Sequence, residues 1–188
     1  MMELNIQATQ KENPFLSEVV QASGEKIQAC FQCQKCSAGC PVVYAMDIYP
    51  NQMLRHIQYG HRDRVLTSKT IWICASCYTC SVRCPNDIDI AKIMDVLRSL
   101  ALRSGAKPGE KDIPVFHSVF LESIKSKGRI HELSLILQFK SKTKDFLKDA
   151  GLGWKMFRKG KIKLLPSRLG GGKEIQEIFN GFGKEEGR

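Results

Sequence analysis

The chain has 188 residues, of which 43% are hydrophobic and 26% are charged, proportions that are ordinary for a folded globular protein. It contains no run of about eighteen apolar residues, which argues against a membrane-spanning helix, and its first residues lack the pattern of a secretory signal. We therefore expect a cytoplasmic protein that has no membrane partner.

The formal net charge of +10 is concentrated in one window. Residues 125–168 hold thirteen Lys and Arg against three Asp and Glu, whereas the rest of the chain has sixteen of each sign. Such a window can dock acidic partner subunits, bind nucleic acid or simply face solvent. Because no nucleic-acid-binding motif accompanies it, we favour a docking surface and expect no nucleic acid partner.

The first predicted element is a helix that begins after Asn13. Asn can cap a helix, Pro14 is tolerated in the first turn, and the apolar residues that follow recur at helical spacing as far as Gly24. The short alternating stretch at residues 3–6 is compatible with an edge strand or a disordered arm. We assign residues 1–25 to an N-terminal arm and helix.

All eight cysteines lie in two runs of the form C-x2-C-x2-C-x3-C-P, at residues 30–41 and 74–85. This is the known pattern of bacterial two-cluster ferredoxins, in which three closely spaced thiolates bind one [4Fe–4S] cluster and the fourth binds the other. We therefore predict two [4Fe–4S] clusters. The predicted ligands are Cys30, Cys33, Cys36 and Cys84 for the first cluster, and Cys74, Cys77, Cys80 and Cys40 for the second.

Two other roles for the cysteines are weaker alternatives. Structural zinc sites also use four thiolates, but zinc modules usually supply their ligands as two separated pairs and not as three plus one. A disulfide framework needs an oxidising compartment, which the expected location does not provide. A zinc-bearing interaction module therefore stays open as the less favoured hypothesis.

The segments after the two Cys-Pro pairs are predicted to be helical. Pro50 opens a pattern that ends at Gly60, residues 62–66 form another helical turn, and Ser68 is the expected cap of the helix leading into the second run. Asp89 can cap the clearest helix, which Gly105 would end. Its predicted buried stripe consists of Ile90, Ile93, Met94, Leu97, Leu100 and Ala101.

The two halves of residues 26–106 repeat one another. The cysteines recur at an offset of 44, whereas the helices that follow them recur at an offset of 40, which implies a four-residue insertion after Pro41. We expect a pseudo-twofold unit in which each half supplies three ligands, one distant ligand and one covering helix. Residues 26–106 are thus predicted to form an α-helical ferredoxin-like domain.

Residues 107–188 are predicted to form a basic helical appendage for partner docking. Amphipathic patterns indicate helices at 116–124, before Gly128, and at 130–139. Shorter helices around 146–147 and 154–157 would be broken by Gly151, Gly153 and Gly160, followed by an extended arm at 162–166, a hinge at 170–172 and a last helix near Ile175. The predicted fold class is therefore mainly α: a helical ferredoxin-like domain plus an appendage of short helices and an extended arm.

The chain shows no signature of a catalytic site. It has no Cys-Cys-Gly sequence, and no Gly-x-Gly-x-x-Gly follows a predicted strand. The four histidines are scattered, and for Phe31, Trp72 and Tyr78 shielding of the clusters and simple core packing are equally reasonable interpretations. We predict no catalytic residue and expect the chain to move electrons.

With these residues in hand, the sequence resembles the C-type subunit of the soluble heterodisulfide reductases of methanogenic archaea. The resemblance covers most of residues 15–166 and includes both cysteine runs, Pro50-Asn51-Gln52, Ile71-Trp72-Ile73, and residues 154–161 with the Leu-Leu-Pro that follows. The cysteine runs alone are shared with iron–sulfur subunits of succinate, glycolate and glycerol-phosphate oxidising complexes. The alternative is therefore an iron–sulfur subunit of another dehydrogenase complex.

The resemblance implies an electron relay in methanogenesis within an oxidoreductase complex. The A-type subunit of that family carries flavin and iron–sulfur groups and is fed by a hydrogenase or a formate dehydrogenase, and the B-type subunit reduces the mixed disulfide of coenzyme M and coenzyme B. The C-type subunit would pass single electrons from the first of these to the second without substrate chemistry of its own. The functional residues that carry over are the eight cysteines, and all eight are present.

Overall fold

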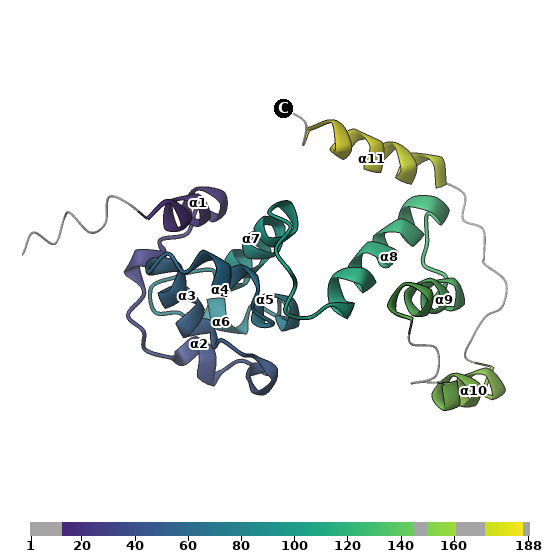
Figure 1. Cartoon of the computed structure of the whole chain (residues 1–188), viewed down its shortest axis with the longest axis horizontal. Helices are drawn as coiled ribbons and strands as arrows, with labels where there is room; N and C mark the ends of the chain where they lie inside the picture. The colour runs from purple at the N-terminus through teal and green to yellow at the C-terminus, as the bar shows by residue number, and fades with distance from the viewer. Residues whose placement is uncertain (1–12, 145–149, 161–171, 186–188) are drawn as a thin grey trace, which may run out of the picture. The chain divides into compact units, whose positions relative to one another are not determined.

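The computed structural model describes residues 13–144, 150–160 and 172–185. The residues that it describes form helices and loops without a β-strand. The chain divides into two compact units, Met1–Glu110 and Lys111–Arg188 (Figure 1). None of the helices in the described ranges has the length and apolar character needed to cross a bilayer.

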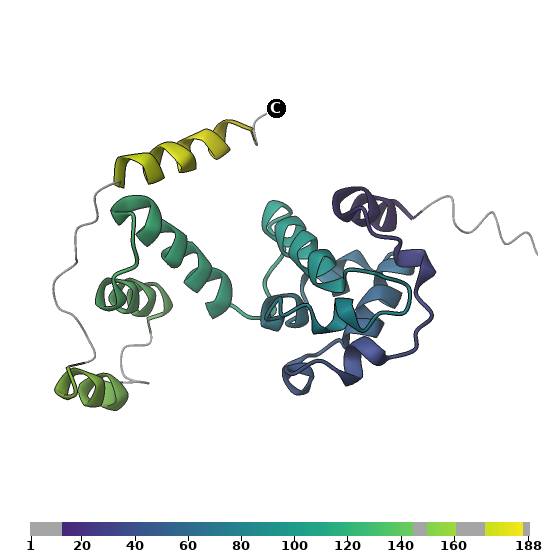
Figure 2. The ribbon, with the colours of Figure 1, turned by 180° about the vertical axis from the view of Figure 1, so that it is seen from behind.

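The first unit is built from seven α-helices and two 3₁₀ helices within its described residues. The longest helix, α7, contacts four others, α1, α4, α5 and α6, and is seen from two sides in Figures 1 and 2. The bounds are α1 (Pro14–Ser23), η1 (Ile27–Ala29), α2 (Lys35–Ala38), η2 (Val43–Ala45), α3 (Pro50–Gln58), α4 (Arg62–Leu66), α5 (Thr70–Ile73), α6 (Thr79–Val82) and α7 (Ile90–Arg103).

Helix α7 forms the centre of the core for reasons visible in its sequence. Asp89 caps it, since its Oδ1 accepts a hydrogen bond of 3.1 Å from the backbone N–H of Lys92, and Gly105 follows its end with a φ of +65°. The predicted stripe is confirmed, because all six of its residues are buried. Burial of one such aliphatic side chain contributes about 1.5–3 kcal/mol, so this face anchors the unit.

Asn13 joins the start of α1 to the end of α3. Its Oδ1 accepts from the backbone N–H of Leu16 at 3.1 Å, which confirms the predicted cap. Its Nδ2 donates to the carbonyls of Ile57 and Gln58 at 3.1 and 2.9 Å. One side chain therefore satisfies unpaired backbone groups at the ends of two helices. Gly60 lies directly against it, because a Cβ there would come within 2.9 Å of Asn13 Oδ1.

The predicted cap of α5 is wrong. Ser68 Oγ donates instead to the carbonyl of Val65 at 2.8 Å. The cap is Asp47, whose two carboxylate oxygens accept from the backbone N–H groups of Lys69 and Thr70 at 3.0 Å each. Because Asp47 precedes α5 by more than twenty residues, local capping rules could not identify it.

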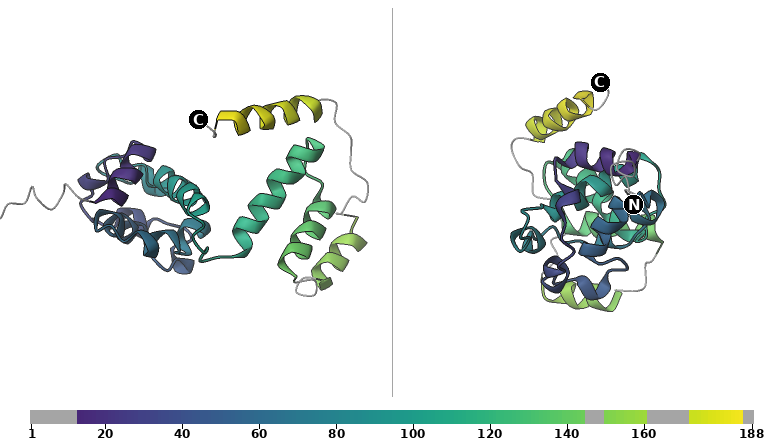
Figure 3. Two further views of the ribbon diagram at one scale, coloured as in Figure 1. Left: turned by 45° about the horizontal axis from the view of Figure 1, so that its top comes forward. Right: turned by 90° about the vertical axis from the view of Figure 1, so that its left-hand side faces the viewer.

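The second unit contains α8 (Asp112–Lys127), α9 (Glu132–Thr143), α10 (Ala150–Arg158) and α11 (Gly172–Glu185). Helix α8 packs against α9 and α11, as the left view of Figure 3 shows. The rings of Phe116 and Phe139 meet edge-on, with 5.7 Å between their centroids. Gly128 ends α8 in the left-handed conformation, with a φ of +70°, which confirms its predicted role.

One prediction for the second unit is wrong, and several cannot be compared. Helix α10 runs through Gly151 and Gly153, although both were expected to break it. Glycine weakens a helix interior by about 1 kcal/mol but does not forbid it. The stretches predicted at 3–6, 146–147 and 162–166, and the hinge at 170–172 apart from Gly172, lie outside the described residues. The domain boundaries at 25/26 and 106/107 stay predictions.

We predict that Asp47→Asn destabilises the first unit at neutral pH. Burial raises the pKa of Asp47, but hydrogen bonds from Lys69 and Thr70 outweigh it, so the net pKa is lowered. A carboxylate with a lowered folded pKa stabilises the fold above its ordinary pKa near 4 and loses this contribution as the pH falls through the folded value. The introduced asparagine keeps one acceptor oxygen but replaces the other with an NH₂ group, so one of the two hydrogen bonds from Lys69 and Thr70 is lost at a cost of about 1 kcal/mol.

The measurement is anaerobic thermal melting from pH 8 to pH 5. We expect the melting temperature of the Asp47→Asn variant to lie below that of the wild type by a constant amount, since Asp47 stays ionised throughout this window. Asp63→Asn is the matched control, because Asp63 is an exposed aspartate in the first turn of α4. Equal melting temperatures for the Asp47→Asn variant and the wild type would contradict the capping role.

Candidate metal centre

Two pockets in the first unit collect all eight cysteines. The first is lined by Cys30, Cys33, Cys36 and Cys84. The second is lined by Cys40, Cys74, Cys77 and Cys80. Each pocket therefore takes three cysteines from one run and one from the other. These are the same groups of four that the sequence predicts as ligand sets.

The two pockets are neighbours. Ile90, the first residue of α7, lines both of them and is 1% exposed. Leu54 and Pro85 complete the apolar side of the first pocket, whereas Met46 and Met94 do so in the second. A single buried aliphatic side chain thus lies between two spaces that are each surrounded by four sulfur atoms.

The loops around the pockets share an uncommon backbone conformation. Gln32 and Gln34 in the first run have positive φ angles of 57° and 64°, and Ser76 and Tyr78 at the corresponding places in the second run have 48° and 60°. Such angles are uncommon outside glycine and cost of order 1–3 kcal/mol, but they turn successive N–H groups toward a common centre that can hold an anionic group. The residue types gave no signal for this, since none of the four is glycine or asparagine.

Arg98 of α7 holds the loop that begins the second run. Its guanidinium donates to the carbonyls of Ile71 and Cys74, and its Nη1 donates to Ser76 Oγ at 3.2 Å. The same Nη1 lies 2.7 Å from Asp95 Oδ1 in an ion pair, and the arginine side chain is only 16% exposed. Sequence reasoning missed Arg98, because it lies among the polar residues of an ordinary amphipathic helix.

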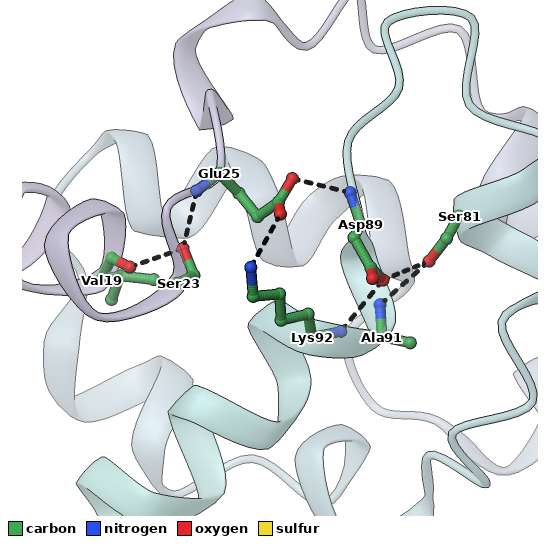
Figure 4. Close-up of polar contacts among 7 residues, drawn as sticks. All are labelled: Val19, Ser23, Glu25, Ser81, Asp89, Ala91 and Lys92. Atoms are coloured by element: carbon green, nitrogen blue, oxygen red, sulfur yellow. Dashed lines mark hydrogen bonds and ion pairs between the residues drawn. The ribbon is translucent and has the colours of Figure 1, made fainter.

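Polar contacts also join the two halves near the pockets. Glu25, just before the first run, accepts from the backbone N–H of Asp89 at 2.9 Å and pairs with Lys92 at 3.5 Å (Figure 4). Asp89 in turn accepts from Ser81 Oγ of α6 at 2.6 Å. The start of α7 is therefore attached both to the segment before the first cysteine run and to α6 within the second run. Asn86 adds a further link by donating to the carbonyl of Ala29.

Several thiols are held in their neutral form by their surroundings. Burial raises the pKa of Cys36 and Cys74, and it raises the pKa of Cys80 to about 11. Cys77 differs, because it is exposed and the neighbouring Thr79 hydroxyl, with Oγ1 3.4 Å from its sulfur, lowers its pKa. Since a metal ligand must be a thiolate, binding at the buried cysteines releases protons.

The donor set suits iron–sulfur chemistry. Neither pocket has a histidine, aspartate or glutamate among the described residues that line it, so sulfur is the available ligand type. Soft thiolates select iron–sulfur clusters, zinc and copper(I). Of these, [4Fe–4S] clusters match best, because each group of four thiols combines three from one run with one from the other.

The three aromatic residues near the cysteines differ in their surroundings. Trp72 is buried in the core, at 4% exposure, although its indole N–H finds no hydrogen-bond partner among the residues that the structure describes. Phe31 lines the first pocket but is 73% exposed, and Tyr78 is also exposed. Core packing therefore describes Trp72, whereas Phe31 and Tyr78 lie at the surface beside the cysteine loops.

The helical fold with two four-thiol pockets is the arrangement expected of a domain that holds two iron–sulfur clusters. Comparison with known families agrees, since residues 29–89 match the 4Fe-4S dicluster domain. The matched residues contain all eight cysteines, and a dicluster domain of this kind supports the presence of two [4Fe–4S] clusters.

The chain is also similar to iron–sulfur subunits from methanogens. It is 38% identical over 99 residues to the C2 iron–sulfur subunit of the CoB–CoM heterodisulfide reductase of Methanocaldococcus jannaschii, covering 48% of this chain and 53% of the relative. It is 36% identical over 104 residues to the C2 subunit of the H(2)/formate:CoB–CoM heterodisulfide,ferredoxin reductase of Methanococcus maripaludis, covering 50% and 56%. The chain thus spans about half the length of the curated relatives that it matches. The resemblance to the C-type subunit of heterodisulfide reductase expected from the sequence is confirmed.

Proposed function

We propose that the chain is the electron-relay subunit of a cytoplasmic heterodisulfide reductase complex and performs no substrate chemistry itself. The observation that carries this proposal is the adjacency of the two four-thiol pockets, which share Ile90. Two neighbouring redox sites in one small domain can transfer an electron from one to the other, whereas a single site can only accept and return it. The names of the similar methanogen subunits support the choice of complex.

In this role the chain positions its cofactors and controls access to them. A [4Fe–4S] cluster accepts and gives one electron at a time. The apolar side chains around Ile90 keep water from the space between the pockets. Each pocket nevertheless has one exposed cysteine, Cys33 in the first and Cys77 in the second. These equivalent positions give each pocket an edge that a partner can approach, so electrons can enter at one edge and leave at the other.

The proposed partners follow from the chemistry of the reaction. Reduction of the coenzyme M–coenzyme B disulfide to two thiols consumes two electrons and two protons, so a one-electron carrier must pass two electrons for each disulfide. We assign the supply to the A-type subunit, which bears flavin and iron–sulfur groups and is reduced by a hydrogenase or formate dehydrogenase, and the disulfide chemistry to the B-type subunit. The names of the relatives, which include hydrogen, formate and the heterodisulfide, support this arrangement.

The second unit is proposed to dock the partner subunits. Its described surface exposes Trp154 and Phe157, whose rings stack with 6.0 Å between centroids. Lys155, Arg158 and Lys159 lie beside them and are exposed. Aromatic residues with neighbouring cations suit the centre and rim of an interface with an acidic partner.

We assign Cys30, Cys33, Cys36 and Cys84 to one cluster and Cys74, Cys77, Cys80 and Cys40 to the other. The grouping of the thiols around the two pockets supports this crossed assignment over one in which each run binds its own cluster. Each run then contributes to both clusters.

We predict that the native complex, purified without oxygen through this chain, contains a flavin-bearing subunit and a disulfide-reducing subunit. The dithionite-reduced complex should be reoxidised by the coenzyme M–coenzyme B disulfide, whereas the reduced chain alone should not. Co-purification with a glycolate- or glycerol-phosphate-oxidising flavoprotein would assign the chain to that other kind of complex. Rapid reoxidation of the isolated chain by the disulfide would contradict the absence of substrate chemistry.

Paired cysteine variants test the crossed assignment. Cys30→Ala/Cys84→Ala removes two ligands from one proposed cluster, so the protein should keep about half of its iron and sulfide. Cys30→Ala/Cys40→Ala removes two cysteines from the first run but one ligand from each proposed cluster, so both clusters should be damaged. Iron analysis and electron paramagnetic resonance of the anaerobic proteins make the comparison. If the Cys30→Ala/Cys40→Ala variant kept more iron than the Cys30→Ala/Cys84→Ala variant, each run would bind its own cluster.

A further inference from the structure

A chain of polar side chains leads to one sulfur of the first pocket. Ser37 Oγ donates to Asn51 Oδ1 at 2.7 Å and accepts from the Asn51 backbone N–H at 3.1 Å. Asn51 Nδ2 donates to Gln32 Oε1 at 3.3 Å. Gln32 Nε2 then donates to Cys30 Sγ, also at 3.3 Å.

This chain determines the orientation of the Gln32 amide. Because the Ser37 hydroxyl occupies Asn51 Oδ1, Asn51 presents its NH₂ group to Gln32. Because that group occupies Gln32 Oε1, the NH₂ group of Gln32 is left to face the Cys30 sulfur. Ser37 and Asn51 are buried, with exposures of 7% and 8%, so water competes weakly for these hydrogen bonds.

The second run lacks this chain. Ser81, the counterpart of Ser37, donates to Asp89 Oδ1 at 2.6 Å and accepts from the backbone N–H of Ala91 at 3.3 Å (Figure 4). Ala91 stands where the first half has Asn51, and it has no amide to pass the interaction on. Ser76, the counterpart of Gln32, donates to Asp95 Oδ1 at 3.3 Å and accepts from Arg98, so its hydroxyl is engaged by α7.

We propose that Gln32, oriented by Asn51 and Ser37, raises the reduction potential of the cluster bound at Cys30. The inference rests on the proposed function, since it requires a cluster in the first pocket. Reduction adds one electron, and part of the added negative charge falls on the cysteine sulfurs. An N–H donor stabilises that more negative state more than the oxidised state, so it favours reduction.

Gln32 therefore acts as a tuning residue that makes the first pocket a better electron acceptor. Charged groups act on both pockets as well: Lys35 lines the first, and Arg98 donates to the carbonyl of Cys74 in the second. For this reason the contribution of Gln32 is measured as the change in one cluster's reduction potential when Gln32 is replaced. It is not the difference in reduction potential between the two clusters.

The test is a potentiometric titration of the anaerobic holo-protein, followed by electron paramagnetic resonance. Gln32→Met keeps the length of the side chain and removes its donor. We expect one of the two potentials to fall, so that the reduced-to-oxidised ratio of that cluster at a fixed potential drops about tenfold, equal to about 59 mV for a one-electron couple. Gln32→Glu should cause a larger fall of the same potential, because it adds a negative charge as well.

Two further variants separate this effect from a general disturbance of the loop. Gln34→Met makes the same substitution at another positive-φ glutamine of the same loop, one that makes no hydrogen bond to a cysteine sulfur within the described part of the chain. It should not shift either potential comparably. Asn51→Ala places at this position the residue type that the second half has there. It should lower the same potential as Gln32→Met by a smaller amount, because the Gln32 amide is then present but not oriented.

The outcomes distinguish the inference from the proposed function. Two clusters with unchanged potentials in the Gln32→Met variant, or an equal fall in the Gln34→Met variant, would overturn the inference alone. If the Gln32→Met variant cannot retain the first cluster, unchanged potentials in the Asn51→Ala variant overturn it instead. A wild-type protein with fewer than two clusters by iron analysis would overturn the proposed function and the inference together.

Discussion

The exchange of one cysteine between the two runs is the constraint on which the first unit depends. Each pocket is lined by three cysteines from one run and a fourth from the other, so neither pocket is complete until both halves of the domain are together. Cluster binding and folding are therefore expected to be strongly coupled. This dependence accounts for a domain built from short helices, several of which have only four residues and could not be stable alone.

The remaining contacts reinforce this exchange at points where the chain returns to the pockets. Glu25 accepts from the backbone N–H of Asp89, and Asn86 donates to the carbonyl of Ala29, so the segment before the first run is attached to the segment after the second run. The side chain of Arg83 lies across Gly39, where an added Cβ would come within 2.7 Å of it. The two halves thus hold each other in register through polar contacts as well as through the shared Ile90.

The sequence predicted those features that follow from local patterns. Cysteine spacing indicated the pockets, and apolar periodicity with Asp89 and Gly105 indicated α7. The contacts that it did not predict are long-range, since they join residues that are distant in the chain. They are the Asp47 cap of α5, the hydrogen bonds from Arg98 to the carbonyls of Ile71 and Cys74, and the path from Ser37 to Cys30. No local rule identifies such partners, because the same residues would be unremarkable on a solvent-facing surface. The error at Gly151 and Gly153 arose from treating a modest helix penalty as a break.

The account depends on two iron–sulfur clusters lying side by side in one small helical domain. The most direct test is the iron and acid-labile sulfide content of the anaerobically purified wild-type chain, measured together with its Mössbauer spectrum. The account predicts about eight irons and eight sulfides per chain, all in [4Fe–4S] form. A colourless protein that holds two zinc ions and no labile sulfide would contradict it.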